Sequence, residues 1–349
     1  MKTLVVNKEG GLQICEVPIP PYSPKQALVK MVSCGICNGT DKKLVHQSFK
    51  GFTKEDYPLM LGHEGVGQIV EIGDQVKGLH PGDFVMLPFV DHDPEYYNGN
   101  GSGWGAYSEY GVVDDVLAYE DGTAPESAYA QTVVPKEIDP VDAAMIVTLR
   151  EVLSAIHQFG ILSTSKVVVI GCGPVGLTFI RFLKLMGVSD VIAVARNESK
   201  LAEAGKNGAD HKINSTTQVT KDRIREIFPE GAEFVIDAVG SSDIINEAME
   251  YIVDGGKICC YGISAKCQME LDWSRAPYNW TLQFQQFPSK KMEGEMTEQI
   301  LSWIGQGEIC LKDFVSDYFS FENILEAFQK LEAGEIKKKG IITYGEHRR

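Results

Sequence analysis

The chain has 349 residues, which is longer than one compact core usually supports, so its length predicts two domains. A formal net charge of -15 excludes binding to nucleic acid or to an anionic membrane through a general basic field. The first residues do not resemble a signal peptide, and no stretch reaches the roughly 18 apolar residues of a membrane span, so we expect a cytoplasmic protein.

The eight cysteines are expected to be reduced thiols. They lack the regular spacing of a disulfide framework. Cys259 and Cys260 lie in an apolar run and are expected to be small buried residues. The full set is Cys15, Cys34, Cys37, Cys172, Cys259, Cys260, Cys267 and Cys310.

The chain from residue 28 to about residue 134 predicts a β-rich domain. Short runs such as ALVKMV, VGQIVEIG, DFVMLP and SEYGVV are separated by Gly, Pro and Asp. This pattern is typical of a partly open β-barrel or meander.

The pattern changes at residue 166, where the apolar runs VVVIG, VIAVA, FVIDAVG and KICCYGI begin to alternate with amphipathic helices. Unbroken apolar strands of this kind indicate a parallel sheet covered on both faces. Two more helices, at 297–307 and 321–334, and a strand at 340–345 follow. We therefore expect a Rossmann domain over 148–290 and a second domain made of 1–147 and 291–349.

A dinucleotide site is predicted directly after the first of these strands. The run VVVIGCGPVG places Gly171, Gly173 and Gly176 in the G-x-G-x-x-G spacing, with Pro174 and Val175 opening a helix. The glycines allow a tight turn, close approach to a pyrophosphate and close helix packing, and the helix N-terminus favours phosphate. The alternative is a tight turn without a ligand.

The end of the second strand bears on the choice of cofactor. An NAD site usually has an acidic residue there, whereas this strand ends Ala195-Arg196. A guanidinium pairs bidentately with phosphate, so the sequence favours NADP over NAD, with Lys200 assigned to the same site. The alternative is that Arg196 is a solvated surface charge.

Two short motifs carry metal-ligand chemistry. Cys34-Gly-Ile-Cys37 alone could be a redox dithiol or two buried thiols, and His63-Glu64 alone could be a structural pair. Together, CGICNGTD, GHE, PGDFV, GAYSEY and GCGPVG resemble the zinc-dependent branch of the medium-chain dehydrogenase/reductase superfamily over almost the whole chain. The resemblance implies a GroES-like catalytic domain, a Rossmann domain, and a catalytic zinc on Cys37 and His63 with Glu64 at the metal.

The resemblance also implies the remaining parts of this site. Glu151 is the expected third protein ligand, although an alignment from the glycine loop places Val147 there instead. Thr40 is expected to pass the alcohol proton outward, and Asp41 to orient the ligand imidazole. The segment is one residue longer than is usual, so Asn38 is an alternative donor.

Cofactor contacts are expected at the ends of two later strands, where the resemblance places the nicotinamide carboxamide. These positions are Ala238, Val239, Gly240, Tyr261 and Gly262. Because residues 85–134 contain no cysteine, no structural zinc is expected. In the loop 91–105, Asp91, His92 and Trp104 are expected either to reach the site or to be solvated.

The resulting hypothesis is a zinc-dependent enzyme that transfers a hydride between NAD(P) and a secondary alcohol, polyol or sugar-type substrate. The alternatives are a zinc-free reductase of quinones or activated double bonds, and a cofactor-binding protein without catalysis. Phe49, Phe52, Phe89 and Trp104 are candidate lining residues. The aromatic run 277–287 is expected to join subunits into a homodimer or homotetramer.

Overall fold

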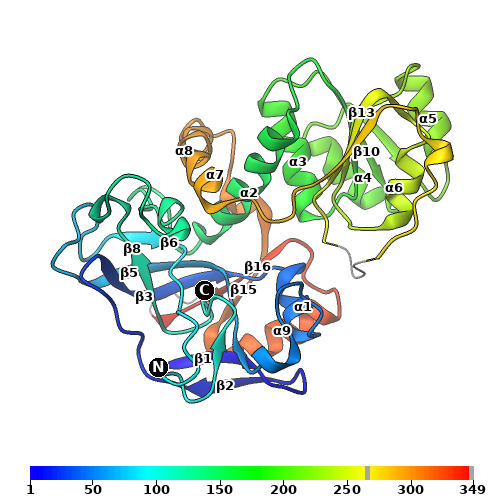
Figure 1. Ribbon diagram of the computed structural model, residues 1–349. Coiled ribbons are helices and arrows are strands. Elements are labelled where there is room, and N and C mark those ends of the chain that lie inside the picture. The colour runs from blue at the N-terminus through cyan, green and yellow to red at the C-terminus, as the bar shows by residue number, and fades with distance from the viewer. Residues whose placement is uncertain (264–267, 346–349) are drawn as a thin grey trace. The chain divides into compact units, whose positions relative to one another are not determined.

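The computed structural model describes residues 1–263 and 268–345 (Figure 1). The chain forms two compact units. The first consists of Met1–Arg150 and Ser289–Arg349, and the second of Glu151–Pro288. The seven cysteines among the described residues are free, and Cys267 lies outside those residues.

The first unit contains two β-sheets, which confirms the β-rich domain expected from the sequence. The smaller sheet has the order β2-β1-β4-β7, and the larger has the order β15-β16-β3-β5-β6 with β8 also paired to β3. The strands are β1 (Lys2–Val6), β2 (Leu12–Glu16), β3 (Gln26–Gly35), β4 (Leu59–Met60), β5 (Glu64–Ile72), β6 (Phe84–Met86), β7 (Gly101–Ser102), β8 (Tyr110–Asp114), β15 (Val315–Ser320) and β16 (Lys339–Thr343).

Strand β3 organises the larger sheet and brings distant segments together. It pairs antiparallel with β5, β8 and β16, and nearly all of its residues are buried. At its end Gly35 lies opposite Glu64, the first residue of β5, and opposite Ile341 of β16. The end of β3, the start of β5 and the start of β16 therefore meet at one edge of the sheet.

Short helices complete the first unit. They are α1 (Thr40–Val45), α7 (Lys290–Glu295), α8 (Thr297–Gly305) and α9 (Ile324–Glu332), with 3-10 turns at Lys54–Asp56, Val116–Ala118, Glu126–Tyr129, Leu311–Phe314 and Phe321–Asn323. The single helix expected over 321–334 is thus a 3-10 turn followed by α9. Helix α2 (Ala144–Phe159) runs across the boundary between the units.

The second unit is a doubly wound parallel sheet, as expected. Its strand order is β11-β10-β9-β12-β13-β14, and every neighbouring pair is parallel. The strands are β9 (Lys166–Ile170), β10 (Asp190–Ala195), β11 (His211–Asn214), β12 (Ala232–Asp237), β13 (Ile252–Cys260) and β14 (Trp280–Phe284). The helices are α3 (Pro174–Leu185), α4 (Glu198–Lys206), α5 (Thr220–Ile227) and α6 (Ser242–Ala248), with a 3-10 turn at Trp273–Arg275.

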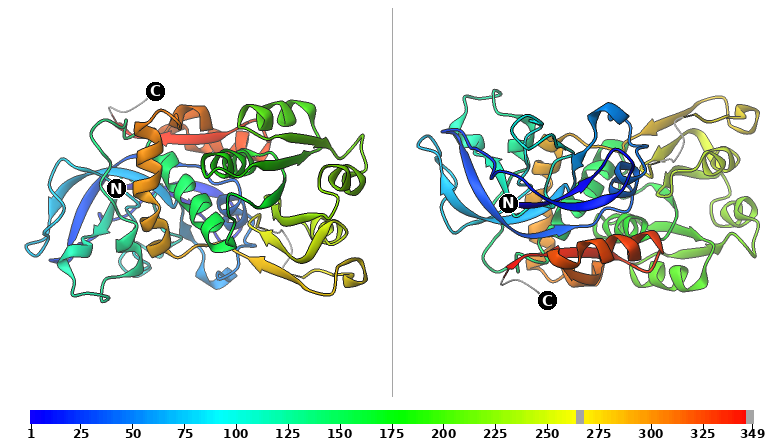
Figure 2. Two further views of the ribbon diagram at one scale, coloured as in Figure 1. Left: turned by 90° about the horizontal axis from the view of Figure 1, so that it is seen from above. Right: turned by 90° about the horizontal axis from the view of Figure 1, so that it is seen from below.

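The strand order of this sheet reverses between β9 and β12. From β9 the chain moves outward to β10 and β11, then returns to β12 on the other side. Because such crossovers are right-handed, the helices of the two halves cover opposite faces, as Figures 1 and 2 show. Ligands of open α/β sheets bind at the carboxyl ends of the strands beside this reversal.

Strands β9 and β10 read as apolar runs because both faces of the sheet are covered, and their residues are almost all buried. Among the described residues, none of the helices has the length and apolar character needed to cross a membrane.

Candidate metal centre and nucleotide loop

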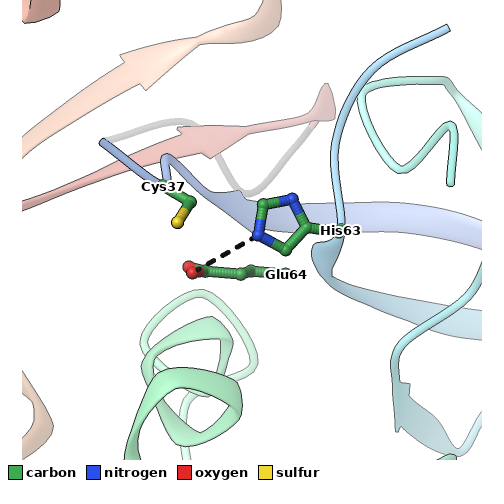
Figure 3. Close-up of side chains that lie close together, drawn as sticks. All are labelled: Cys37, His63 and Glu64. Carbon is green, nitrogen blue, oxygen red and sulfur yellow. Dashed lines mark ion pairs between the residues drawn. The ribbon is translucent and has the colours of Figure 1, made fainter. Parts of the chain in front are cut away.

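Cys37, His63 and Glu64 converge at the edge of the larger sheet. One ligand atom from each lies within 4.8 Å of the others (Figure 3). Cys37 follows the end of β3, whereas His63 and Glu64 stand at the start of β5. His63 and Glu64 are buried, and Cys37 is half-buried. The structure thus brings together three of the four expected metal ligands.

Two glycines make room for this cluster. A Cβ at Gly35 would overlap Oε2 of Glu64, so only glycine lets the carboxylate lie against β3. Gly62 has a φ of 101°, and a Cβ there would overlap the backbone of Tyr107. The glycine that precedes His63 is therefore required both by its backbone conformation and by its neighbour.

Asp41 lies behind the imidazole, as expected. Its Oδ1 is 3.7 Å from Nδ1 of His63, while Nε2 of His63 is 3.9 Å from Oε1 of Glu64. Within the described residues neither Nδ1 of His63 nor Oδ1 of Asp41 has a hydrogen-bond partner, and both are buried. We infer that Nδ1 carries the ring proton and faces the Oδ1 acceptor, which leaves Nε2 toward Cys37 and Glu64.

Lys339 is a charged neighbour that the sequence did not reveal. It begins β16, and its Nζ donates to both carboxylate oxygens of Glu64, at 2.8 and 2.6 Å. Both side chains are buried, with exposed fractions of 8% for Lys339 and 1% for Glu64. The only local signal was a basic residue before the last strand, in a run of three lysines.

The surroundings of the cluster set the protonation states of Cys37 and Glu64. Burial raises the pKa of Cys37 to about 12, and the negative charge of Glu64 adds to this. Burial is the strongest single influence on Glu64 and acts to raise its pKa, but the positive charges of Lys339 and His63 and the hydrogen bonds to the carboxylate together outweigh it and hold this pKa below the ordinary value of a glutamate. Cys37 therefore stays a thiol until a cation takes the place of its proton.

The donor set fits a divalent zinc ion. Thiolate, imidazole and carboxylate are its usual protein ligands, and three of them leave a coordination position open. Glu151 belongs to the second unit and is not in the cluster, so its role as a ligand stays a prediction. Thr40 is buried at the start of α1, and its backbone N–H donates to the Cys37 sulfur. Asn38 is exposed.

Aromatic rings adjoin His63, one of the expected metal ligands. The ring of Trp104 lies 5.5 Å from the His63 ring, 5.9 Å from Phe49 and 6.2 Å from Phe52, between ring centroids. Trp104 has a φ of 70°, a conformation that is rare for a bulky side chain and that tends to occur at functional sites. Phe89 instead forms a β-bridge with Val112.

The other two candidates in the loop 91–105 behave differently. Nδ1 of His92 accepts a hydrogen bond from the backbone N–H of Ser102 at 3.0 Å. His92 therefore closes the loop on itself, and Asp91 is exposed.

The glycine-rich loop follows β9 at the strand reversal. Gly171 has a φ of 97° and packs against Val239, and a Cβ at Gly176 would overlap the carbonyl of Gly171. Gly173 differs, because a Cβ there would meet nothing within 4 Å. The protein itself leaves this space open at the start of α3, as the close approach of a pyrophosphate to a helix N-terminus requires.

Asp237 holds the neighbouring loop and was missed by the sequence reasoning. It is buried at the end of β12, where its carboxylate accepts the backbone N–H groups of Val239, Gly240 and Ser241 at 2.8, 2.9 and 3.2 Å. An acidic residue at the end of an apolar strand was the available signal. This loop contains the expected cofactor positions Ala238, Val239 and Gly240.

The other expected cofactor positions follow β13. A Cβ at Gly262 would overlap the backbone of Val239 and Gly240, so the two loops are in close contact. The ring of Tyr261 packs edge-on against Phe179 of α3, with centroids 5.0 Å apart. The expected positions 238–240 and 261–262 thus lie together beside the glycine-rich loop.

The end of β10 carries positive charge. Ala195 ends the strand, and Arg196 is exposed. Burial raises the pKa of Cys172 to about 11, and the positive charge of Lys200 acts to lower it. Cys172 belongs to the glycine-rich loop. A cation therefore acts at the loop where the phosphates of a dinucleotide are expected.

Glu198, the first acidic residue after β10 in the sequence, forms a hydrogen bond with the neighbouring strand β11. Glu198, at the start of α4, accepts a short hydrogen bond from the amide of Asn214 at the end of β11. Asn197 caps α4 through Ser199.

Comparison with known proteins places the chain among dehydrogenases. Residues 23–120 match the alcohol dehydrogenase GroES-like domain, and residues 174–292 match the zinc-binding dehydrogenase family. A D-xylulose reductase from Saccharomyces cerevisiae is 26% identical over 340 residues, covering 94% of this chain and 93% of that protein. An L-threonine 3-dehydrogenase from Symbiobacterium thermophilum is 28% identical over 274 residues, covering 75% and 74%. The structure of an alcohol dehydrogenase from Thermus sp. ATN1 matches with a TM-score of 0.79, 24% identity and coverage of 99% and 100%, which supports the fold.

Proposed function

The chain belongs to the zinc-dependent branch of the medium-chain dehydrogenase/reductase superfamily, and from this we propose that it is an NAD(P)-dependent alcohol or polyol dehydrogenase. It transfers a hydride between a nicotinamide ring and a secondary alcohol, polyol or sugar-type substrate. The observation that carries the proposal is the convergence of Cys37, His63 and Glu64 within 4.8 Å. The open glycine-rich loop of the second unit supplies the complementary cofactor site.

One zinc ion is proposed at the cluster, held by Cys37 and His63, with Glu64 and Glu151 as candidates for the remaining ligand. The chemistry that zinc supplies when bound is Lewis acidity toward an alcohol oxygen, and the nicotinamide supplies a hydride acceptor. Asp41 keeps Nδ1 of the His63 imidazole as the donor, so that Nε2 is available to the metal.

The protein must also remove the alcohol proton. The hydroxyl of Thr40 is proposed to pass it outward, since Thr40 is buried next to Cys37. Asn38 is the alternative, because its exposed side chain adjoins the same ligand. Loss of activity with zinc retained in Thr40→Val, but not in Asn38→Ala, would distinguish the two.

NADP is proposed as the preferred cofactor. Arg196 and Lys200 supply positive charge where an NAD site needs a carboxylate, and Asn214 holds Glu198. The competing outcome is equal use of both cofactors, which would make Arg196 a solvated charge.

A homodimer or homotetramer in the cytoplasm is also proposed. Strand β14 lies at the edge of the parallel sheet, and Phe284 within it and Phe287 just beyond are exposed by 48% and 47%. An unpaired apolar edge of this kind is usually covered, and a second copy of the same strand would cover it. Sedimentation as a monomer at micromolar concentration would contradict this.

The substrate wall is proposed to contain Phe49, Phe52 and Trp104, since their rings adjoin His63. The similarity to a D-xylulose reductase favours a polyol, whose C–H faces can pack on aromatic rings. A panel of polyols and simple alcohols with NAD and with NADP would identify the preferred class.

The decisive experiment is zinc per chain by elemental analysis. We expect one zinc in the purified protein, its loss in Cys37→Ser, and its retention in the matched control Cys310→Ser, because Cys310 is exposed and outside the cluster. Loss of zinc in Glu151→Ala would support that ligand.

The alternative function is that of a zinc-free reductase of quinones or activated double bonds. Protein never exposed to chelator that contains no zinc, and that reduces quinones or activated alkenes with NADPH, would establish the rival instead.

A further inference from the structure

Tyr107 contacts the carboxylate that stands behind the ligand imidazole. Its hydroxyl lies 2.7 Å from Oδ2 of Asp41 and 2.9 Å from the carbonyl of Gly35. A phenol has one proton, and the shorter contact to a charged acceptor is the stronger hydrogen bond, so this proton goes to Asp41. The backbone N–H of Cys37 donates to the same Oδ2 at 2.9 Å.

These two donors saturate one oxygen of Asp41 and leave the other for the histidine. Oδ1 has no hydrogen-bond partner in the described part of the chain and lies 3.7 Å from Nδ1 of His63. The two hydrogen bonds that Oδ2 accepts therefore fix the orientation of the carboxylate. Asp41 itself is fully buried, so water cannot replace a lost donor without entering the core.

Tyr107 is held rigidly enough to do this. Its side chain is fully buried, and its ring packs edge-on against Phe328, with centroids 5.8 Å apart. Its backbone N–H donates to Leu61 and its carbonyl accepts from Leu4, both at 2.8 Å. Gly62, next to His63, has no Cβ that would push Tyr107 away.

We propose that Tyr107 is a positioning residue of the metal centre, whose hydroxyl orients Asp41 and through it the imidazole of His63. The proposal rests on the proposed function only in taking His63 as a zinc ligand. Partners of this outer kind typically change metal affinity by about 10- to 100-fold when removed. Because Cys37 still holds Asp41 in the variant, we expect the lower end of this range.

The test is the zinc affinity of Tyr107→Phe, measured by competition with a chromophoric chelator. The variant keeps the ring and its packing on Phe328, and we expect its zinc dissociation constant to rise about 10-fold. The matched control is Tyr57→Phe, because Tyr57 is equally buried in the same core and its hydroxyl donates to the carbonyl of Leu44 in α1 at 2.8 Å. The control loses a buried hydroxyl that anchors the helix carrying Asp41, and its zinc affinity should change less than about 2-fold.

A double-mutant cycle tests the route through Asp41. In an Asp41→Ala background, Tyr107→Phe should change zinc affinity by less than about 2-fold, because the group on which it acts is gone. An unchanged affinity in Tyr107→Phe, a loss equal to that of Tyr57→Phe, or a full 10-fold loss in the Asp41→Ala background would each overturn the proposal.

Alcohol oxidation is measured in parallel to separate the two claims. A wild type that binds zinc but oxidises no alcohol refutes the proposed function and leaves the positioning role intact. A wild type that oxidises alcohols, with Tyr107→Phe equal to it in zinc affinity, refutes the positioning role alone. Wild-type protein that binds no zinc refutes both.

Discussion

Replacing Lys339 by Met should destabilise the first unit strongly when no metal is bound. The change removes the ammonium that donates to both oxygens of Glu64 at 2.8 and 2.6 Å, and leaves a carboxylate that is 1% exposed without its counter-ion. Breaking a buried ion pair in this way costs about 3–5 kcal/mol. For a domain of 150–250 residues this corresponds to a fall in Tm of roughly 6–20 °C.

The assay is thermal unfolding of the chelator-treated protein, monitored by a spectroscopic signal that reports on the first unit. Lys330→Met is the matched control, because its ion pair with Glu326 is exposed and contributes at most about 1 kcal/mol. Glu64→Gln combined with Lys339→Met should recover most of the loss, since no buried charge remains. A Lys339→Met protein as stable as the control would show that Glu64 is not held as a buried carboxylate, and the account of the cluster would be wrong.

Further substitutions test the other parts of the structure. Arg196→Ala should raise the Kd for NADP about 10- to 100-fold, because a charged hydrogen bond to phosphate is lost, and should leave the Kd for NAD nearly unchanged. Titration with each cofactor measures both constants. Gly62→Ala should cost at least about 3 kcal/mol in urea unfolding, because strain at a φ of 101° is joined by overlap with Tyr107. Gly82→Ala, at a φ of 93° with open space, should cost only about 1–2 kcal/mol; equal losses would refute the overlap. Asp237→Ala should weaken binding of both cofactors alike, because three backbone N–H groups of the loop lose their acceptor, and calorimetry showing unchanged affinity would contradict this.

The sequence alone predicted the family and both domain types, because these depend on local patterns. Unbroken apolar strands alternating with amphipathic helices specify a covered parallel sheet whatever lies elsewhere in the chain. The spacing of Gly171, Gly173 and Gly176 describes a turn that forms within ten residues. Cys37 and His63 were found through short motifs, although their roles, like those of Thr40 and Glu151, stay predictions.

The partners of these residues were decided only by the tertiary structure. Strand β3 pairs with β16 on one side and with β5 on the other, and this arrangement at Gly35 brings Lys339 to Glu64 from the other end of the chain. Tyr107 meets Asp41 because the backbone at Gly62 leaves room for it. Hydrophobic patterns reveal which face of an element is buried, but not which distant charge or hydroxyl will meet it there. That depends on sheet register, which the packed fold determines.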